Sequence, residues 1–508
     1  MYSIVHSGGL DGIKSFIAHV EVDVSQGLPG FYLVGKLNGE VKEAKERVRV
    51  SLRNSGIELP PYLITINISP ANIQKNGTAY DLPIAIGILN AMGQIPGDAL
   101  TDTIIIGELS LDGKIRHVNG VLPILLNAKD NGYKRCIVPI DNANEAKYVD
   151  DIEILPATDL LEAIELLQRN DISGIPAVEY DDKISDDILY DKDFSDIIGQ
   201  EACKRAALIA AAGFHHLLIL GPPGAGKTMI AKRIPSIMPP LTSEESMEVS
   251  TIYSIAGLLS DSKPYISVRP FQNPHHTSTK QALTGGGRVA TPGIISLSHK
   301  GVLFLDEFPE FSRECIEVLR EPLEEKSINI SRVNYNYTFP ADFMLVAASN
   351  PCPCGFFPNR NRCNCSEPMI ARYRAQLSGP IKDRIDIIVT AEQITADKLI
   401  GVKSKQKNTS INSQYMRDMV AKAREHQKVR FEGSSLTYNS DITANLIDTY
   451  CPLGKEESEY MHDVYNSMNL SARSYHKILK VARTIADLDD SDKIKLPHLT
   501  EAICYRGN

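Results

Sequence analysis

The stretch "LLILGPPGAGKTMIAKRI", residues 217–234, constrains the fold more than any other part of the chain. It places an apolar run, a glycine-rich turn and a helix-forming run in direct succession. Gly221, Gly226, Lys227 and Thr228 match every fixed position of the phosphate-loop pattern G-x-x-x-x-G-K-[ST]. In that pattern a strand leads into the loop, and backbone N–H groups and a helix N-terminus then surround the phosphates. The stretch therefore predicts an α/β core that binds ATP.

Eight residues form the predicted phosphate loop: Gly221, Pro222, Pro223, Gly224, Ala225, Gly226, Lys227 and Thr228. Lys227 is expected to reach the β and γ phosphates, and Thr228 is expected to ligate magnesium. The alternative is a chance glycine turn. The apolar run before the loop and the helical pattern after it argue against that alternative.

A second apolar run, "GVLFLDEF" at residues 301–308, ends in two carboxylates. Asp306 is expected to hold magnesium, directly or through water, and Glu307 to polarise the attacking water. Paired acids at the end of a strand can also form a solvated turn. Their position after a phosphate loop, in the order that ATPases use, favours the catalytic interpretation.

The chain is too long for one hydrophobic core, and its 508 residues suggest about three domains. Residues 1–168 mix β-rich runs with a helical pattern that places Val41, Ala44, Val48 and Leu52 on one face, which predicts an α+β domain. Residues 169–194 form an acidic, exposed linker. Residues 195–395 alternate strands and helices, as in a parallel sheet covered on both faces. Residues 396–508 comprise a basic linker and a helical region.

The N-terminus shows no signal-peptide pattern, and no apolar run is long enough to span a membrane, so a soluble, cytoplasmic protein is expected. The chain carries 54 Lys and Arg against 63 Asp and Glu, a net charge of -9. A nucleic-acid partner would therefore have to meet a local basic surface. Nine cysteines, an odd number, fit reduced thiols rather than a disulfide scaffold.

Four of those cysteines lie in "CPCGFFPNRNRCNC", residues 352–365. Cys352, Cys354, Cys363 and Cys365 can supply four thiolates to one tetrahedral ion. Four sulfur ligands suit a structural zinc, with an iron–sulfur cluster as a second possibility. Free thiols or redox pairing are the alternative, because Cys-x-Cys spacing is less usual than Cys-x-x-Cys.

Five stretches together resemble one known group of motor proteins: "GPPGAGKT", "LFLDE", "AASNPCPCG", "GPIKDRIDI" and "LSARSYHKILKVARTIADL". The chain resembles magnesium-chelatase-like AAA+ ATPases, and within them the ComM/YifB family with its N-terminal Lon-protease-like domain. The resemblance covers nearly the whole chain. It implies an AAA+ core with a helical lid and a homo-oligomer, expected to be a hexamer. It also implies roles for Asn350 as sensor 1, Arg384 as the arginine finger offered to a neighbouring subunit, and Arg473 as sensor 2.

Two N-terminal stretches, "IQKNGTAYDLPIAIGIL" and "IGELSLDGKIRHVNGVLPILLNAKDNG", resemble the serine and lysine motifs of Lon-type proteases. The resemblance places Ala79 at the serine position and Leu122 near the lysine position. Both catalytic groups are therefore expected to be missing, which implies a Lon-like fold used for binding or assembly. Thr78 is the remaining candidate nucleophile, and it lacks a lysine partner.

Candidate DNA contacts are the exposed cations near the predicted site, namely Lys280, Arg288, Arg360 and Arg362. A solvated basic face is the alternative interpretation of such residues. His275 and His276 suggest a metal site, but no Cys or acidic ligand lies near them in the sequence. Hydrogen bonding within their loop is the favoured interpretation.

The residues predict an ATP hydrolase, and the resemblance implies what it acts on. The favoured function is movement on single- or double-stranded DNA, as in branch migration during recombination or natural transformation. A motor that remodels protein or inserts a metal is the alternative, and the absence of an acidic partner domain argues mildly against it. An ATP-dependent protease is disfavoured by Ala79 and Leu122.

Overall fold

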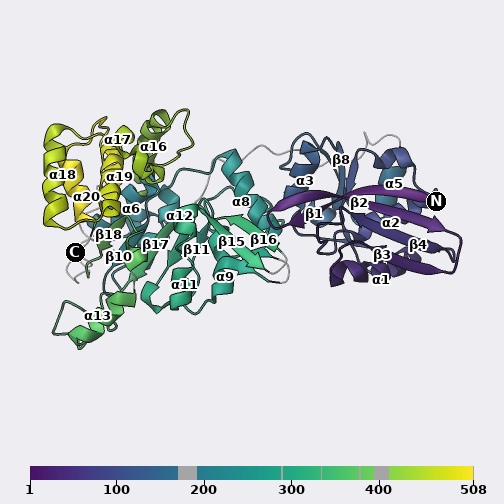
Figure 1. The fold of residues 1–508 in the computed structure, drawn as a ribbon, viewed down its shortest axis with the longest axis horizontal. Helices are drawn as coiled ribbons and strands as arrows, with labels where there is room; N and C mark the ends of the chain where they lie inside the picture. Colours follow the sequence, from purple (N-terminus) through teal and green to yellow (C-terminus); the bar gives the residue numbers. More distant parts are fainter. Residues whose placement is uncertain (170–191, 288–289, 333–334, 377–378, 394–410, 507–508) are drawn as a thin grey trace.

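The computed structural model describes residues 1–169, 192–287, 290–332, 335–376, 379–393 and 411–506, and most of both predicted linkers falls outside these ranges. Figure 1 shows three parts arranged along the long axis of the molecule. We call them the N-terminal domain (residues 1–169), the central domain (192–393) and the C-terminal helical domain (411–506).

The N-terminal domain is built on one mixed sheet, in the order β3-β4-β2-β1-β5-β8-β9. Its strands are β1 (Tyr2–Asp11), β2 (Lys14–Ser25), β3 (Gly30–Val34), β4 (Leu63–Ser69), β5 (Thr103–Ile105), β8 (Arg135–Pro139) and β9 (Glu153–Ala157). Strands β1, β2 and β4 pair antiparallel, whereas β3 pairs parallel with β4, and β5, β8 and β9 run parallel to β1. Strand β3 is thus an edge of the sheet.

Helices cover both faces of this sheet. They are α1 (Gly39–Asn54), α2 (Asp81–Ala91), α3 (Val121–Asp130), α4 (Ala143–Ala146) and α5 (Leu160–Gln168). Helix α1 starts at Asn38, whose side chain accepts a hydrogen bond from the N–H of Val41, and it buries the predicted stripe. Helices α1, α2 and α5 share one apolar cluster with the sheet, and α3 and α4 pack on the opposite face. The predicted α+β domain is confirmed in its elements.

The central domain contains a parallel sheet in the order β11-β14-β17-β10-β18 among its described residues. The strands are β10 (Leu217–Leu220), β11 (Phe271–Gln272), β14 (Val302–Leu305), β17 (Met344–Ser349) and β18 (Ile387–Thr390). Strands β14 and β17 are wholly buried, because separate apolar clusters cover the two faces. This confirms the sheet predicted from the alternating pattern.

Because the sheet is parallel, the carboxyl ends of β10, β14 and β17 meet at one edge. Helices and hairpins surround the sheet: α6 (Glu201–Gly213), α7 (Lys227–Ala231), α8 (Ser243–Ile255), α9 (Lys280–Thr284), α10 (Ile294–Leu297), α11 (Arg313–Glu317), α12 (Pro322–Glu325), α13 (Glu367–Gln376), α14 (Gly379–Lys382), β12–β13 (Gly285–Gly286 with Thr291–Pro292) and β15–β16 (Ser327–Arg332 with Tyr335–Pro340). Near the start of this domain, Asp193 caps a short helix and accepts hydrogen bonds from the N–H of Ser413.

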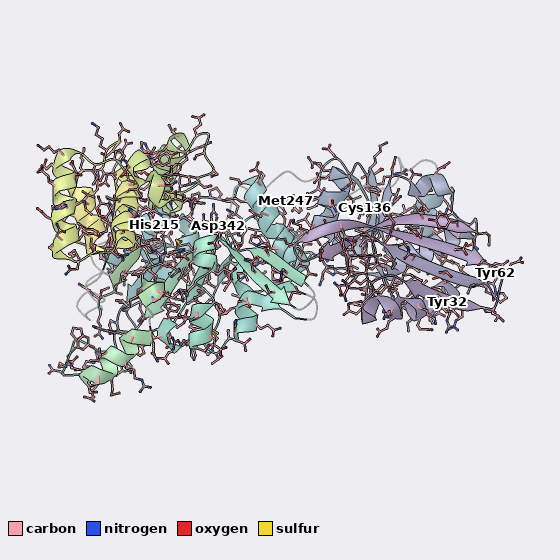
Figure 2. The ribbon with its side chains drawn as sticks, in the orientation of Figure 1. Tyr32, Tyr62, Cys136, His215, Met247 and Asp342 are labelled. Atoms are coloured by element: carbon pink, nitrogen blue, oxygen red, sulfur yellow. The ribbon has the colours of Figure 1, made fainter. Side chains whose placement is uncertain are left out.

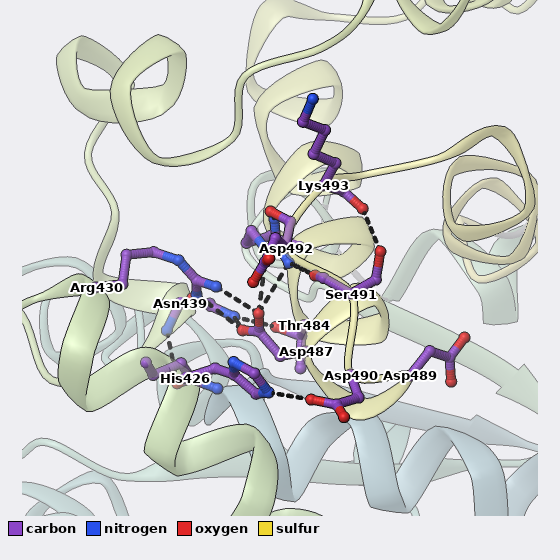
Figure 3. Close-up of polar contacts among 12 residues, drawn as sticks. His426, Arg430, Asn439, Thr484, Asp487, Asp489, Asp490, Ser491, Asp492 and Lys493 are labelled. Atoms are coloured by element: carbon purple, nitrogen blue, oxygen red, sulfur yellow. Dashed lines mark hydrogen bonds and ion pairs between the residues drawn. The ribbon is translucent and has the colours of Figure 1, made fainter.

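The C-terminal helical domain contains α16 (Ser413–Arg430), α17 (Ile447–Tyr450), α18 (Lys455–Ser467), α19 (Ala472–Leu488) and α20 (Leu496–Cys504). Figure 3 shows the polar centre of this domain, where the buried carboxylate of Asp487 accepts hydrogen bonds from Arg430, Arg483 and Asn439. Thr484 continues this network to His215 of the central domain, with 2.8 Å between the threonine Oγ1 and the histidine Nε2. Buried, mutually satisfied polar groups of this kind fix how the helices and the sheet pack together.

Helix α8 joins the N-terminal domain to the central domain. The carbonyl of Ser254 accepts a hydrogen bond of 3.0 Å from the N–H of Gly120, and its hydroxyl donates to Glu145. Glu145 in turn accepts from the N–H of Leu122 at 3.1 Å. Met247 of the same helix packs against the apolar cluster beneath α3, and Figure 2 places it at the boundary between the two domains. These buried contacts define the α8 junction (Gly120, Leu122, Glu145, Met247 and Ser254).

Candidate nucleotide-binding site

The phosphate loop runs from the end of β10 to the start of α7. Gly224 and Gly226 have φ angles of 78° and 84°, a backbone region that residues with a side chain rarely adopt. Gly221 is required for a different reason, because a Cβ there would lie 2.7 Å from the carbonyl oxygen of Ala391. The glycines of the pattern are therefore needed both for the turn and for its packing against the end of β18.

Lys227 lies at the first position of α7 and is buried. Its ammonium donates to the carbonyl oxygens of Gly221 at 2.6 Å and Pro222 at 3.1 Å, and to Oδ1 of Asn350 at 3.0 Å. Burial lowers the pKa of Lys227, while the charge of Asp306 opposes that shift. The structure thus joins the loop lysine to the residue expected to be sensor 1, which lies 123 positions further along the chain.

The two carboxylates follow β14 at the same edge of the sheet. Thr228 donates to Oδ2 of Asp306 at 2.7 Å, so the two predicted magnesium ligands are in contact. Glu307 has a left-handed backbone with φ of 51°, and its N–H donates to Oδ1 of Asp306 at 3.0 Å. That conformation costs free energy in a residue other than glycine, and such strain is typical of functional sites. Hydroxyl and carboxylate oxygens are the donor set that magnesium prefers.

These residues line one cavity of about 410 Å³. Its lining comprises Pro223, Gly224, Ala225, Gly226, Lys227, Thr228, Met229, Asp306, Glu307, Ala348, Ser349 and Asn350. The predicted cofactor-binding loop, the acid pair and Asn350 therefore converge at the carboxyl edge of the sheet. The cavity combines backbone donors, one cation and two carboxylates, which is the chemistry needed to bind ATP with magnesium and to activate a water.

One histidine makes a contact with the acid pair that sequence reasoning missed. His276 lies with its Nδ1 3.3 Å from Oε2 of Glu307, whereas His275 pairs with Thr277 of its own loop at 2.8 Å. The expectation of hydrogen bonding within the loop is thus correct for His275 and wrong for His276. No acid is near the histidines in the sequence, but the fold brings Glu307 to them from the neighbouring strand β14. The contact depends on β11 and β14 being neighbours in the sheet, which no local sequence pattern reveals.

The two predicted arginines lie away from the phosphate-loop cavity. Arg384 and Arg473 both pair with Oε1 of Glu324, at 2.7 and 2.8 Å. The three residues border a second cavity of about 560 Å³ between the central and C-terminal helical domains. The neighbouring Arg384, followed by Arg473, lowers the pKa of Glu324. Glu324 had no signal in the sequence, and it pairs with both the buried Arg384 and the exposed Arg473.

The four cysteines come together as predicted. Their sulfur atoms all lie within 4.8 Å of one another, and the sulfur of Cys352 is 3.4 Å from that of Cys354 and 3.7 Å from that of Cys363. A tetrahedral zinc with Zn–S bonds of about 2.3 Å requires sulfur–sulfur distances of about 3.8 Å. The residues present therefore fit a zinc ion. Phe356 and Phe357 pack against the cluster and add a small apolar contact.

The cysteine segment also touches the phosphate loop. Gly355 has a φ of 83° and lies so close to Pro223 that a Cβ would approach its ring to 2.4 Å. Of the cations proposed for DNA, Arg360 pairs with Glu367, and Arg362 stacks on Phe356 and donates to Gln393 at 3.1 Å. Lys280 is exposed at the start of α9, and Arg288 lies outside the described residues.

The Lon-like motif residues border a third cavity, of about 350 Å³, beside the α8 junction. The hydroxyl of Thr78 donates to Glu108, and no lysine is among the described residues that line the cavity. Leu122 is fully buried in the apolar cluster beneath α3. Thr78 thus has an acid partner rather than the lysine base that a Lon-type nucleophile uses.

Across the described ranges, we find no helix with both the length and the apolar character that crossing a membrane requires.

Three family models match the chain: "Magnesium chelatase, subunit ChlI" over residues 193–399, "Subunit ChlI of Mg-chelatase" over 20–142 and "Magnesium chelatase, subunit ChlI C-terminal" over 410–506. These matches follow the three domains of the structure.

The chain is also similar to full-length bacterial proteins. It is 39% identical to competence protein ComM of Haemophilus influenzae over 99% of this chain and 97% of the relative. It is 40% identical to the uncharacterized protein YifB of Escherichia coli over the same shares of both chains. A weaker match, 33% identity over 130 residues, covers 25% of this chain and 23% of Lon protease 2 of Bacillus subtilis.

Proposed function

Because the chain belongs to the magnesium-chelatase-related AAA+ family that includes the ComM and YifB proteins, we propose that it is a ring-forming ATPase that moves on DNA. The observation that carries the ATPase part is the single cavity that joins Lys227, Thr228, Asp306, Glu307 and Asn350. The proposed activity is ATP-driven translocation or branch migration in recombination or natural transformation. The proposed site of action is the cytoplasm.

In the proposed reaction each residue has a distinct task. Lys227 exchanges its carbonyl contacts for the β and γ phosphate oxygens and compensates their charge. Thr228 and Asp306, already in contact, hold the magnesium ion that accompanies ATP. Glu307 accepts a proton from the attacking water, and Asn350 positions that water near the γ phosphate. His276 contacts the carboxylate of Glu307 and so fixes its orientation.

The two arginines support a ring. Arg384 and Arg473 share Glu324 and line a cavity that is separate from the chain's own phosphate cavity. We assign Arg384 as the finger that completes the site of the adjacent subunit, with Arg473 acting beside it as sensor 2. An always-charged bidentate group stabilises the charge that develops on the transferred phosphoryl group. A closed ring, proposed as a hexamer, supplies each site with such a neighbour.

DNA as the substrate is supported by the similarity to a protein named for competence. The test is ATP hydrolysis measured with and without forked or four-way DNA. Stimulation by these structures is expected. A rate that does not change with any DNA would favour the alternative, a motor that remodels protein or inserts a metal.

We also propose that Cys352, Cys354, Cys363 and Cys365 hold a structural zinc. The ion would fix a segment that is too short to be held by burial alone and that rests on the phosphate loop through Gly355.

The N-terminal domain is proposed to bind or assemble rather than to cleave peptides, since Thr78 pairs with Glu108.

A further inference from the structure

A groove at the outer end of the N-terminal domain has no part in the proposed ATPase reaction. It lies between the second half of α1, the edge strand β3 and the segment at residues 57–62, and it has a volume of about 660 Å³. We call it the α1–β3 groove. Figure 2 shows Tyr32 and Tyr62 at this end of the molecule, far from the boundary marked by Met247. The groove is therefore separate from the nucleotide site and from the α8 junction.

One wall of the groove is cationic. Lys45, Arg49 and Arg53 line it from α1, four residues apart, and so form one stripe along the helix. Four residues advance a helix by about 6 Å, which is close to the distance between successive phosphates in an extended nucleic-acid strand. Arg53 is exposed, and within the described part of the chain it forms no ion pair.

The opposite wall is aromatic and apolar. Phe31 and Tyr62 line it, and both rings also pack against the core of the domain. A backbone hydrogen bond of 3.3 Å from the N–H of Gly30 to the carbonyl of Tyr62 joins the two segments that carry them. Aromatic rings held in this way are suited to stacking with nucleobases.

Acidic residues offset only part of this charge. Glu46 pairs with Arg49 at 2.9 Å and with Lys45 at 4.0 Å, but all three side chains are exposed, so water and salt screen these pairs and a phosphate can replace them. Glu58 is the single acid among the described lining residues. Three cations against one acid leave the groove positive in a protein whose net charge is -9.

We propose that the α1–β3 groove binds single-stranded nucleic acid, with phosphates along Lys45, Arg49 and Arg53 and bases against Tyr62 and Phe31. A cationic wall that follows the backbone and an aromatic wall that receives bases are the two parts of such sites. This site goes beyond the proposed motor function, since it lies outside the ATP cavity and requires no nucleotide. An acidic extended peptide pairing with edge strand β3 is the competing occupant.

The test measures binding of a fluorescent oligothymidine of about 20 nucleotides to the full-length protein without ATP, by anisotropy at several salt concentrations. Replacing Lys45, Arg49 and Arg53 together by Gln is expected to reduce the slope of log K against log salt by about 2, or about 0.7 per cation. Lys42→Gln is the matched control, because Lys42 is exposed on the same helix but does not line the groove. This control should bind like the parent.

A second variant tests the aromatic wall. Tyr62→Leu should weaken binding about ten-fold and leave the salt slope unchanged, because it removes a stacking surface and no charge. Circular dichroism and unstimulated ATP hydrolysis, compared across all variants, show that the fold is intact.

Two results would overturn the proposal. The first is a triple variant that binds oligothymidine with the parent's affinity and salt slope, which would place binding elsewhere. The second is a polyglutamate peptide that displaces the oligonucleotide as well as unlabelled DNA does, which would favour the peptide. Neither outcome depends on the motor function, because Lys227→Ala is expected to retain groove binding while losing ATP hydrolysis. If DNA does not change the rate of hydrolysis but the groove variants lose binding, the motor proposal fails and the groove stands.

Discussion

Lys227 and Glu307 lie in one cavity but contribute at different steps. Lys227→Ala removes the charge that compensates the phosphates, so nucleotide binding should fall strongly. Glu307→Gln keeps that charge and removes only the proton acceptor, so ATP should bind and hydrolysis should slow by about two to four orders of magnitude. Binding of a fluorescent ATP analogue and release of phosphate measure the two effects. Equal hydrolysis by Glu307→Gln and the parent would contradict the assigned role.

The burial of His216 predicts that the free energy of unfolding of the protein depends on pH. This side chain is mostly buried, its Nδ1 accepts the N–H of Leu345 at 3.1 Å, and burial lowers its pKa to about 4, against the opposing charge of Asp386. The folded protein therefore binds fewer protons than the unfolded chain between about pH 6.5 and pH 4. Stability should fall as the pH drops through that window, by at most about 2 kcal/mol between pH 7.5 and pH 5.

The measurement is the free energy of unfolding of the parent and of His216→Gln at the two pH values. The glutamine can still accept the Leu345 N–H but does not titrate, so its loss of stability should be smaller. Identical losses in the two proteins would assign the effect to groups other than His216.

Single residues also show where sequence reasoning stopped. The phosphate loop could be predicted in full, because its spacing encodes a local backbone geometry. The contact of His276 with Glu307 could not, since it depends on which strands are neighbours. Glu324 is a third case, because an exposed glutamate carries no signal until the fold places two arginines beside it.

Among the elements, the cysteine segment carries the clearest prediction. Purified protein should contain about one zinc per chain, and Cys363→Ser should lose most of it. Because Gly355 packs on Pro223, loss of the ion should also weaken ATP binding several-fold. Cys504→Ser is the control, since Cys504 is exposed on α20 away from the cluster. Metal analysis that finds no zinc, with all four thiols freely titratable in the native protein, would contradict the assignment.

The type of a helix or strand could be predicted from the sequence where its apolar residues follow a single helical or strand pattern. The stripe on α1, the buried strands β10, β14 and β17, and the apolar face of α19 all follow from local patterns. Pairing was not predictable, because β3 joins β4 across the whole of α1 and so places the groove beside an edge strand. Local patterns determine the type of an element, whereas its neighbours depend on the packing of the whole domain.

At the scale of the whole molecule, ATP hydrolysis in one subunit is expected to depend on Arg384 of a neighbouring subunit. Arg384→Ala should bind ATP nearly normally and hydrolyse it poorly, because its own phosphate loop is intact. Lys227→Ala has a defective loop but still offers Arg384 to a neighbour. Mixing the two inactive proteins should therefore restore part of the hydrolysis, provided that subunits exchange.

Exchange can be followed by energy transfer between labelled subunits. Mixed rings that remain as inactive as their components would show that Arg384 acts within its own chain or only supports the fold. The control mixes Lys227→Ala with Glu307→Gln, two variants that both offer Arg384 but lack a working site of their own. That mixture should stay inactive.

The α8 junction bears on whether the N-terminal domain could accommodate a Lon-type lysine. The Lon resemblance places the catalytic lysine near Leu122, which is fully buried, and the N–H of Leu122 donates to Glu145 at the contact with Ser254. A lysine there would have to bury an ammonium group in an apolar cluster or separate α3 from α8. Leu122→Lys alone would therefore weaken the docking of the two domains rather than supply a Lon-type base.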